Sequence, residues 1–200
     1  MTKIAIIYYS STGNNHKLAV AAGDGAASFG AEIRIRKVKE LAPDSAIDSR
    51  PEWRAHVEAT VDVQEAQLDD LDWADGFIVG TPTRFGLPAA QIKQFLDQCG
   101  PLWAQGKLQD KPVGAFTGAG NAHGGQESTI LALNNVFYHW GCLIVPTGYT
   151  DPIIKAAGGN PYGVSFTDTR SDLPQTTLDA ARYLGTRVAR FATALASSRS

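Results

Sequence analysis

Cysteine is scarce in this sequence, which has only Cys99 and Cys142 among its 200 residues. The two lie far apart in apolar or helical contexts, so we expect two reduced thiols; a disulfide or a metal-binding pair is the alternative. The sequence also has only four histidines, and none has the spacing to another that is typical of metal ligands. No metal site is therefore predicted, and His16 and His56 are expected on the polar surface.

An excess of charge of one sign is also lacking. The 18 Lys and Arg residues stand against 20 Asp and Glu residues, which gives a formal net charge of -2. This balance predicts neither a basic surface for nucleic acid nor the strongly acidic face with which an electron carrier docks on basic partners.

Long hydrophobic runs are absent as well. No run approaches the ~18 apolar residues that a membrane helix needs, and we expect no signal peptide before the first apolar run. We therefore expect a cytoplasmic protein. The length and a hydrophobic content of 44% predict one domain over residues 1–196, and the polar end at 197–200 is expected to be a disordered tail.

The chain opens on an apolar run, residues 4–9, that ends abruptly in the polar sequence Ser-Ser-Thr-Gly-Asn-Asn at residues 10–15. A short apolar run without alternation predicts a strand buried on both faces, as in a parallel sheet. Residues 16–29 are compatible with a helix, and Gly30 is expected to cap it. A strand, a tight polar loop and a helix N-terminus together form an anion site, and without a lysine in the loop this is not a nucleoside-triphosphate P-loop.

The rest of the chain repeats the alternation of strand and helix. Further strands are predicted at 31–38, 75–80, 112–116 and 142–146, and further helices at 88–100, 126–140 and 176–196. The second strand alternates polar with apolar residues, so we expect it at an edge. These patterns predict an α/β fold with a doubly wound, five-stranded parallel sheet in the order 2-1-3-4-5.

Residues 40–72 and 147–175 are predicted as long loops, and residues 53–71 of the first leave room for a helical turn or two. The first loop is expected to contact another subunit, because a connection usually takes ~2–6 residues. Gly23 and Gly25 lie inside the first helix, where close packing against the sheet would explain them.

Three unusual loops follow the first, third and fourth strands, so we expect them side by side at the carboxyl edge of the sheet, where ligands bind in such folds. The second loop, Thr-Pro-Thr-Arg-Phe-Gly at residues 81–86, resembles a motif of the WrbA-type NAD(P)H:quinone oxidoreductases, a flavodoxin-like family. Residues 118–129, with Gly-Gly-Gln-Glu at 124–127, resemble the same family, as do residues 95–98, 102–103, 145–149 and 159–163. The resemblance covers nearly the whole chain in order.

This resemblance implies FMN as the cofactor. The phosphate would be held by the first loop, by Ser10, Ser11, Thr12, Gly13, Asn14 and Asn15. The second and third loops would border the flavin through Pro82, Thr83, Arg84, Phe85, Thr117, Gly118, Ala119, Gly120, Asn121 and Gly124. Arg84 would stabilise negative charge on the reduced flavin, His139 would hydrogen-bond the flavin or a quinone, and Trp103 would be an aromatic wall for the substrate.

Each of these roles has a structural alternative. The first loop alone could be a helix cap without a ligand, Arg84 a surface salt-bridge partner, His139 a structural histidine and Trp103 an ordinary packing residue. The chain also departs from the family, which often has an aromatic residue where Thr12 stands, and His123 lies in a third loop that is one residue longer.

The resemblance implies an enzyme that reduces quinones with NAD(P)H in two-electron steps, as a homotetramer whose sites are completed by neighbouring chains. The alternatives are a one-electron carrier of the flavodoxin type and a regulatory protein that binds a transcription factor.

Overall fold

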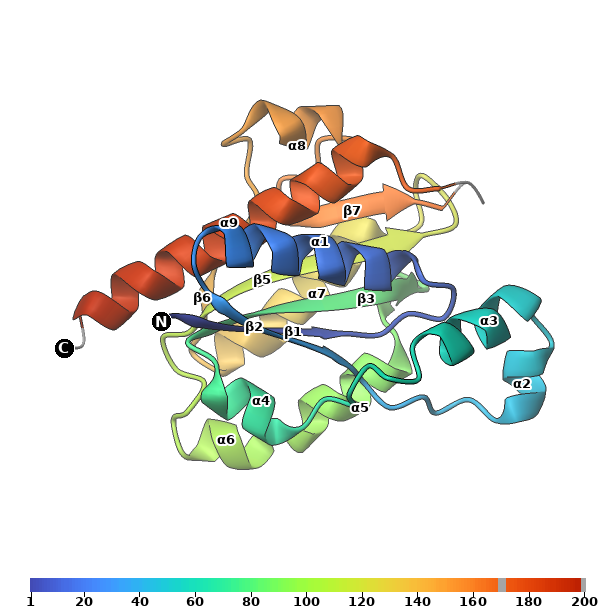
Figure 1. Cartoon of the computed structure of the whole chain (residues 1–200), viewed down its shortest axis with the longest axis horizontal. Helices are drawn as coiled ribbons and strands as arrows, with labels where there is room; N and C mark the ends of the chain where they lie inside the picture. The colour runs from blue at the N-terminus through green and yellow to red at the C-terminus, as the bar shows by residue number, and fades with distance from the viewer. Residues whose placement is uncertain (169–171, 199–200) are drawn as a thin grey trace.

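The computed structural model describes residues 1–168 and 172–198 and is built on a parallel sheet (Figure 1). The sheet order is β2-β1-β3-β5-β6, which confirms the predicted order for the five successive positions. These strands are β1 (Lys3–Tyr8), β2 (Glu32–Lys37), β3 (Gly76–Arg84), β5 (Pro112–Ala119) and β6 (Leu143–Ile144). β1 is buried along its length except at Lys3, and β2 lies at the predicted edge.

The fifth position of the sheet is divided between two strands. β6 pairs only with the first two residues of β5, whereas β7 (Val164–Thr167) pairs with the last four. The predicted strand at 142–146 is therefore too long, because Pro146 has no N–H with which to continue the ladder. The predicted loop at 147–175 instead contains α8 (Pro152–Ala156) and β7.

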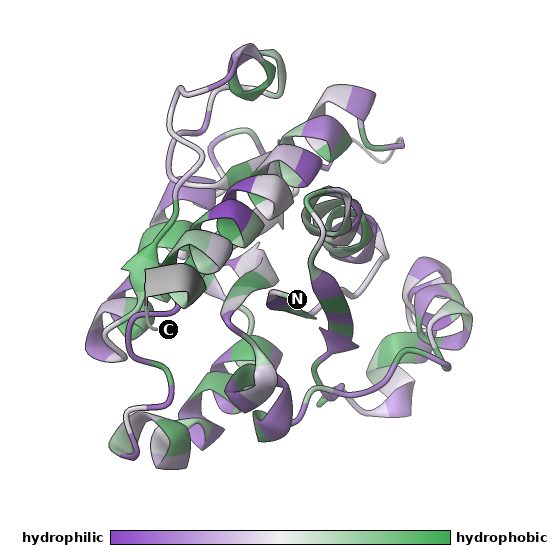
Figure 2. Cartoon of the chain, turned by 60° about the vertical axis from the view of Figure 1, so that its left-hand side comes forward, coloured by the Kyte–Doolittle hydropathy of each residue, from purple (hydrophilic) through white to green (hydrophobic). Residues whose placement is uncertain are grey.

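Helices cover both faces of the sheet and enclose a separate hydrophobic core on each side (Figures 1 and 2). One face carries α1 (Asn14–Ser28) and α9 (Gln175–Ser198). The other carries α4 (Leu68–Trp73), α5 (Ala90–Gln98), α6 (Gly100–Ala104) and α7 (Gln126–His139). α9 runs two residues past its predicted end, so residues 197 and 198 of the predicted tail are helical, and residues 199–200 lie outside the described residues.

Two glycines allow α1 and α9 to cross at backbone contact. A Cβ added at Gly25 would lie 1.9 Å from the carbonyl oxygen of Arg182, and one at Gly185 would lie 1.9 Å from that of Ala22. The prediction that Gly25 packs against the sheet is therefore wrong, since it faces a helix. Gly23 does face the sheet, where its Cβ would meet Ile35 of β2 at 3.0 Å.

An arm of two short helices replaces most of the predicted loop at 40–72. α2 (Asp44–Asp48) and α3 (Pro51–Ala59) stand beside the carboxyl ends of the strands, away from the main helical layers (Figure 1). Arg54 joins them through ion pairs of 2.6 Å to both Asp44 and Asp48. The sequence indicates helical structure here only weakly, as a turn or two within 53–71, because α3 buries no residue and therefore has no apolar stripe.

Both cysteines are buried and free, and burial raises the pKa of each thiol to about 12. They are accordingly unreactive at neutral pH. In the part of the chain that the structure describes, none of the helices is both long and apolar enough to cross a membrane.

Candidate active site

The loop after β1 is shaped by a hydrogen bond between its own residues. The backbone N–H of Gly13 donates to Oγ of Ser10 over 2.9 Å, and Gly13 has a φ of 96° that few other residues adopt. Gly13 is the N-cap residue of α1 and has no side chain with which to cap the first turn. The amides of that turn therefore face the loop with a favourable dipole, as an anion site requires.

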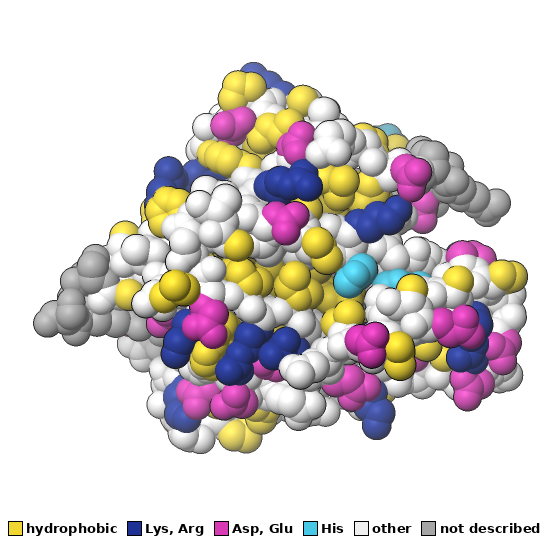
Figure 3. Space-filling model, in the orientation of Figure 1, with side chains coloured by type: hydrophobic (Ala, Val, Ile, Leu, Met, Phe, Trp, Pro, Cys, Tyr) yellow, Lys and Arg dark blue, Asp and Glu magenta, His cyan; other side chains and the backbone are white. Residues whose placement is uncertain are grey.

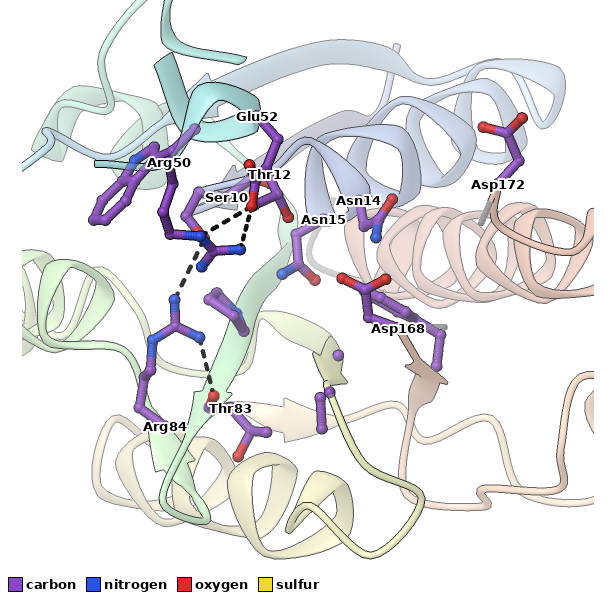
Figure 4. Close-up of a pocket in the computed structure, with 17 residues that line it drawn as sticks. Ser10, Thr12, Asn14, Asn15, Arg50, Glu52, Thr83, Arg84, Asp168 and Asp172 are labelled. Atoms are coloured by element: carbon purple, nitrogen blue, oxygen red, sulfur yellow. Dashed lines mark hydrogen bonds and ion pairs between the residues drawn. The ribbon is translucent and has the colours of Figure 1, made fainter. Parts of the chain in front are cut away.

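The three predicted loops converge on one cavity of about 1350 Å³ (Figure 4). Single ligands occupy pockets of about 300–1,000 Å³, so this space admits a large cofactor together with a second ligand. The predicted residues that line it are Ser10, Ser11, Thr12, Asn14, Asn15, Pro82, Thr83, Arg84, Gly118, Ala119 and Gly120.

Asn15 has a buried polar atom that the described part of the fold leaves unpaired. Its side chain is 3% exposed and lines the cavity, and its Oδ1 has no hydrogen-bond partner among the described residues. Buried polar atoms are almost always paired. A ligand hydroxyl in the cavity would donate the hydrogen bond that Oδ1 of Asn15 lacks.

Arg84 connects the first two loops across the cavity. Its guanidinium donates from Nη2 to Oγ of Ser11 over 3.3 Å and from Nη1 to the carbonyl oxygen of Thr83 over 3.2 Å (Figure 4). Within the described ranges Arg84 has no ion-pair partner, which argues against the alternative of a surface salt bridge. Its positive charge therefore faces ligand space.

Two residues of the predicted set do not line the cavity for visible structural reasons. Thr117 is fully buried and donates through its hydroxyl to the carbonyl oxygen of Thr81 over 2.7 Å, which ties β5 to β3. Phe85 is fully exposed, with a φ of 54°, at the turn between β3 and the antiparallel β4 (Leu87–Pro88).

The third loop is closed by a side chain from α7. Gln126 donates from Nε2 to the carbonyl oxygen of Asn121 over 2.9 Å and accepts at Oε1 from the N–H of Gly124 over 3.0 Å. Asn121 and Gly124 therefore shape the loop and do not line the cavity. Gly118 lines it, but a Cβ at this position would lie 2.0 Å from the ring of Phe166, so its lack of a side chain also serves packing.

Trp103 and His139 lie together near the amino ends of the strands, at the end of the sheet opposite the cavity. Nε1 of Trp103 donates to the carbonyl oxygen of His139 over 2.9 Å. Two residues after His139, the carbonyl oxygen of Gly141 accepts from the N–H of Asp110, at the amino end of β5. The eight residues of β5 span about 25 Å to the cavity, so neither residue belongs to the cavity of its own chain.

Six cavity residues were missed from the sequence: Arg50, Glu52, Trp53, Phe166, Asp168 and Asp172. Glu52 and Trp53 belong to α3, and Arg50 directly precedes it. Phe166 belongs to β7, and Asp168 and Asp172 lie after that strand. Arg50 pairs with Glu52 over 2.6 Å near Thr12 (Figure 4). All six lie in stretches predicted as loops, where only the aromatic residues Trp53 and Phe166 stand out from the polar surroundings.

His16 and His56 are half-buried next to the first loop, so the prediction of surface positions holds only in part. Nδ1 of His16 lies 2.6 Å from the hydroxyl of Tyr8, and the two imidazole rings are 5.8 Å apart. Figure 3 shows histidine side chains at the surface, between the main body of the protein and the arm of α2 and α3. Burial, and then the charge of Lys37, lower the pKa of His16. Burial, followed by His16 and Lys37, lowers the pKa of His56 to about 4.

Comparison with known proteins shows the family to which the chain belongs. The profile of the NADPH-dependent FMN reductase family matches residues 2–151. The chain belongs to this family. A quinone-type NAD(P)H dehydrogenase of Deinococcus radiodurans is 46% identical over 165 residues, which cover 82% of each chain. NAD(P)H dehydrogenase (quinone) 3 of Rhizobium meliloti is 40% identical over 209 residues, which cover 100% of this chain and 96% of the relative.

Solved structures support the same assignment for this FMN reductase family member. A WrbA-like flavodoxin protein from Agrobacterium tumefaciens superimposes with a TM-score of 0.70 at 25% identity over 97% of this chain and 99% of that one. An archaeal flavodoxin, at 18% identity and a TM-score of 0.63 over 96% and 99% of the two chains, shares the fold. The protein is thus a WrbA-type oxidoreductase with a flavodoxin-like fold, and its cofactor is FMN.

The residues of the cavity fit this cofactor. The loop at 10–13 and the first turn of α1 offer amide and hydroxyl donors for a phosphate, and the orphaned amide of Asn15 suits a ribityl hydroxyl. In the described part of the chain, no group of three or more His, Cys, Asp or Glu side chains is placed to hold a metal ion.

Proposed function

We propose that this enzyme transfers two electrons from NAD(P)H to a quinone, which leaves as the hydroquinone. The observation that carries the proposal is the single cavity in which the anion-binding loop, Arg84 and the backbone of residues 118–120 meet. Support also comes from the curated relatives, which are named NAD(P)H dehydrogenase (quinone). FMN, when bound, supplies the hydride transfer, and the chain supplies binding, orientation and electrostatics.

The first loop has the role of fixing the cofactor phosphate. Ser10 holds the loop closed through the N–H of Gly13, which leaves Ser11, Thr12 and the first-turn amides of α1 to donate to phosphate oxygens. Asn14 and Asn15 extend this polar wall toward the ribityl chain. The helix dipole adds favourable interaction with the dianion.

The second loop has the role of favouring electron acceptance. Arg84 brings a positive charge into the cavity beside Thr83 and Ser11. A fixed cation at the ring system stabilises the negative charge that reduction adds there. The backbone of residues 118–120 would border the opposite side, and at Gly120 a Cβ would meet nothing within 4 Å.

We further propose that Trp103 and His139 act in the site of another copy of the chain. They lie beside each other near the amino ends of the strands, opposite the cavity. Trp103 is 54% exposed although its side chain is large and apolar. Such a pair would complete a neighbour's cavity in a symmetric oligomer, with Trp103 against the substrate ring and His139 as a hydrogen-bond donor.

The deciding experiment is an anaerobic titration of the FMN-loaded protein with NADH or NADPH, followed by benzoquinone. We expect direct bleaching of the flavin absorbance to the two-electron reduced form, and immediate reoxidation by the quinone. A flavin that ignores both nucleotides but accepts single electrons from a chemical reductant would contradict the proposal and favour a one-electron carrier. A protein that retains no flavin would contradict both.

A further inference from the structure

The arm formed by α2 and α3 brings one aromatic face to the cavity. We propose that Trp53 is the stacking wall for the planar, electron-poor ring of the second ligand, and that Glu40 is the positioning residue that holds the indole. The nature of that ligand, a nicotinamide or quinone ring, rests on the function proposed above. The location of the wall rests on the contacts that follow.

Two aromatic residues line the cavity, Trp53 and Phe166. Phe166 is 8% exposed, belongs to a core cluster and packs its ring against Gly118, so it offers little surface to a ligand. Trp53 is half-buried and belongs to neither core cluster. Its ring therefore faces space that the fold itself does not fill.

The indole is held by hydrogen bonding to a carboxylate. Nε1 of Trp53 donates to Oε2 of Glu40 over 3.1 Å, and the hydroxyl of Tyr9 donates to the same oxygen over 2.9 Å. Oε1 accepts from Nε2 of Gln91 over 2.8 Å and from the backbone N–H groups of the two residues that follow Glu40.

This network fixes the wall relative to the cofactor loop. Tyr9 directly precedes Ser10 of that loop, Gln91 belongs to α5, and Trp53 belongs to α3. Glu40 thus joins three elements at one carboxylate. Preorganisation of this kind removes the entropic cost of orienting a binding side chain at the moment of binding.

The chemistry of the indole selects the class of ring. An indole face carries negative electrostatic potential, which attracts cationic rings such as oxidised nicotinamide and suits electron-poor rings such as quinones. The cavity, at about 1350 Å³, exceeds what one ligand fills, so a second ring can lie against Trp53 while the cofactor is bound.

The test compares FMN-loaded wild-type protein with the variants W53A and W53F. Trp73 provides a matched control, W73A, because its ring contacts Arg34 of the edge strand β2 and does not line the cavity. The ligands are NAD⁺, NADP⁺ and benzoquinone. Binding is measured by calorimetry, contact with Trp53 by quenching of tryptophan fluorescence, and FMN affinity in parallel.

We expect W53A to weaken binding of at least one nucleotide and of benzoquinone by about five- to tenfold, W53F by about twofold, and W73A not at all. The quenching should be reduced in W53F, which keeps Trp103, and should match wild type in W73A. The affinity for FMN should stay within about twofold of wild type in all variants, since the wall faces the second ligand. Unchanged ligand binding in W53A would overturn the proposal, as would a loss of FMN affinity equal to the loss of ligand affinity.

These binding readouts separate the proposal from the function on which it rests. A wild-type protein that binds the nucleotides and quenches through Trp53, yet passes no electrons to quinone, would contradict the proposed function and leave the wall intact. A wild-type protein that reduces quinone while W53A binds every ligand normally would contradict the wall alone.

Discussion

The imidazole rings of His16 and His56 lie 5.8 Å apart, one at the start of α1 and the other on α3. Nδ1 of His56 would lie 3.5 Å from a Cβ placed at Gly13, so the pair lies against the cofactor loop. Two cationic rings at this distance, with Lys37 nearby, would repel each other. The folded state therefore favours the neutral forms of both histidines near the phosphate site.

The first prediction concerns acid sensitivity. Because the pKa of His56 falls from 6.5 to about 4 on folding, its neutral form contributes stability that is fully present above pH 6.5 and is lost as the pH falls toward 4. The full shift corresponds to about 3 kcal/mol, and we expect about 1 kcal/mol because solvent screens the partly exposed ring. Urea unfolding at pH 7.5 and 4.5 measures the difference.

H56Q should lose part of this pH dependence, and H123Q should keep all of it, since His123 is exposed in the third loop. Equal pH dependence in wild type and H56Q would show that other groups carry the acid sensitivity.

The second prediction concerns the crossing of α1 and α9. G185A forces a Cβ to within 1.9 Å of a carbonyl oxygen, so the helices must separate. We expect a loss of about 2–3 kcal/mol in unfolding free energy and a melting temperature about 5–10 °C lower. G100A is the control, because a Cβ there meets nothing within 4 Å and Gly100 has a negative φ. A G185A protein as stable as G100A would mean that the crossing can relax.

Much of this fold could be predicted from the sequence, because buried parallel strands consist of short, uninterrupted apolar runs. The runs at 4–9 and 75–80 and the alternation in β2 sufficed for the sheet order. The divided fifth position was not predictable, since the four residues of β7 form too short a run to stand out. The contact of Gly25 with α9 could not be predicted either, because no local sequence pattern indicates which element packs against a glycine.

The third prediction concerns the first loop. S10A removes the acceptor for the N–H of Gly13 and lets the loop open. The apparent dissociation constant for FMN should rise about tenfold, with little change in melting temperature of the apoprotein. S28A is the matched control, because Ser28 bonds to the carbonyl oxygen of Gly25 at the far end of α1. Tight FMN binding by S10A would mean that the amides alone shape the site.

The fourth prediction tests whether sites are shared between chains. R84A and W103A should each lower quinone reduction by about tenfold or more, Arg84 through lost charge stabilisation and Trp103 through a lost substrate wall. If Trp103 serves a neighbour's cavity, mixed oligomers of the two variants contain some sites with both residues intact. Mixing after mild dissociation should then restore part of the activity.

If the mixture of R84A and W103A regains no activity, although mass spectrometry verifies subunit exchange, then both residues act in the site of the same chain. Mixing R84A with R84A is the control for the procedure itself.

The candidate site was predictable where loops follow buried strands and not where helices lack an apolar face. The hydroxyl and amide groups at 10–15 and the charge of Arg84 could be placed from the loop positions alone. Trp53 could not, because α3 buries nothing and leaves no periodic signal. Trp103 and His139 show a further limit, since a motif in the sequence does not tell whether its residues line the cavity of their own chain, and these two do not.

The divided edge of β5 has a consequence for the composition of the cavity. Phe166 and Asp168, which line the cavity at the end of β7, lie beyond residues 2–151, the part that the family profile matches. The cavity is therefore completed by a part of the chain that the family profile does not describe. Substitutions around β7 can change the space offered to a substrate while the loop that anchors the cofactor phosphate stays the same.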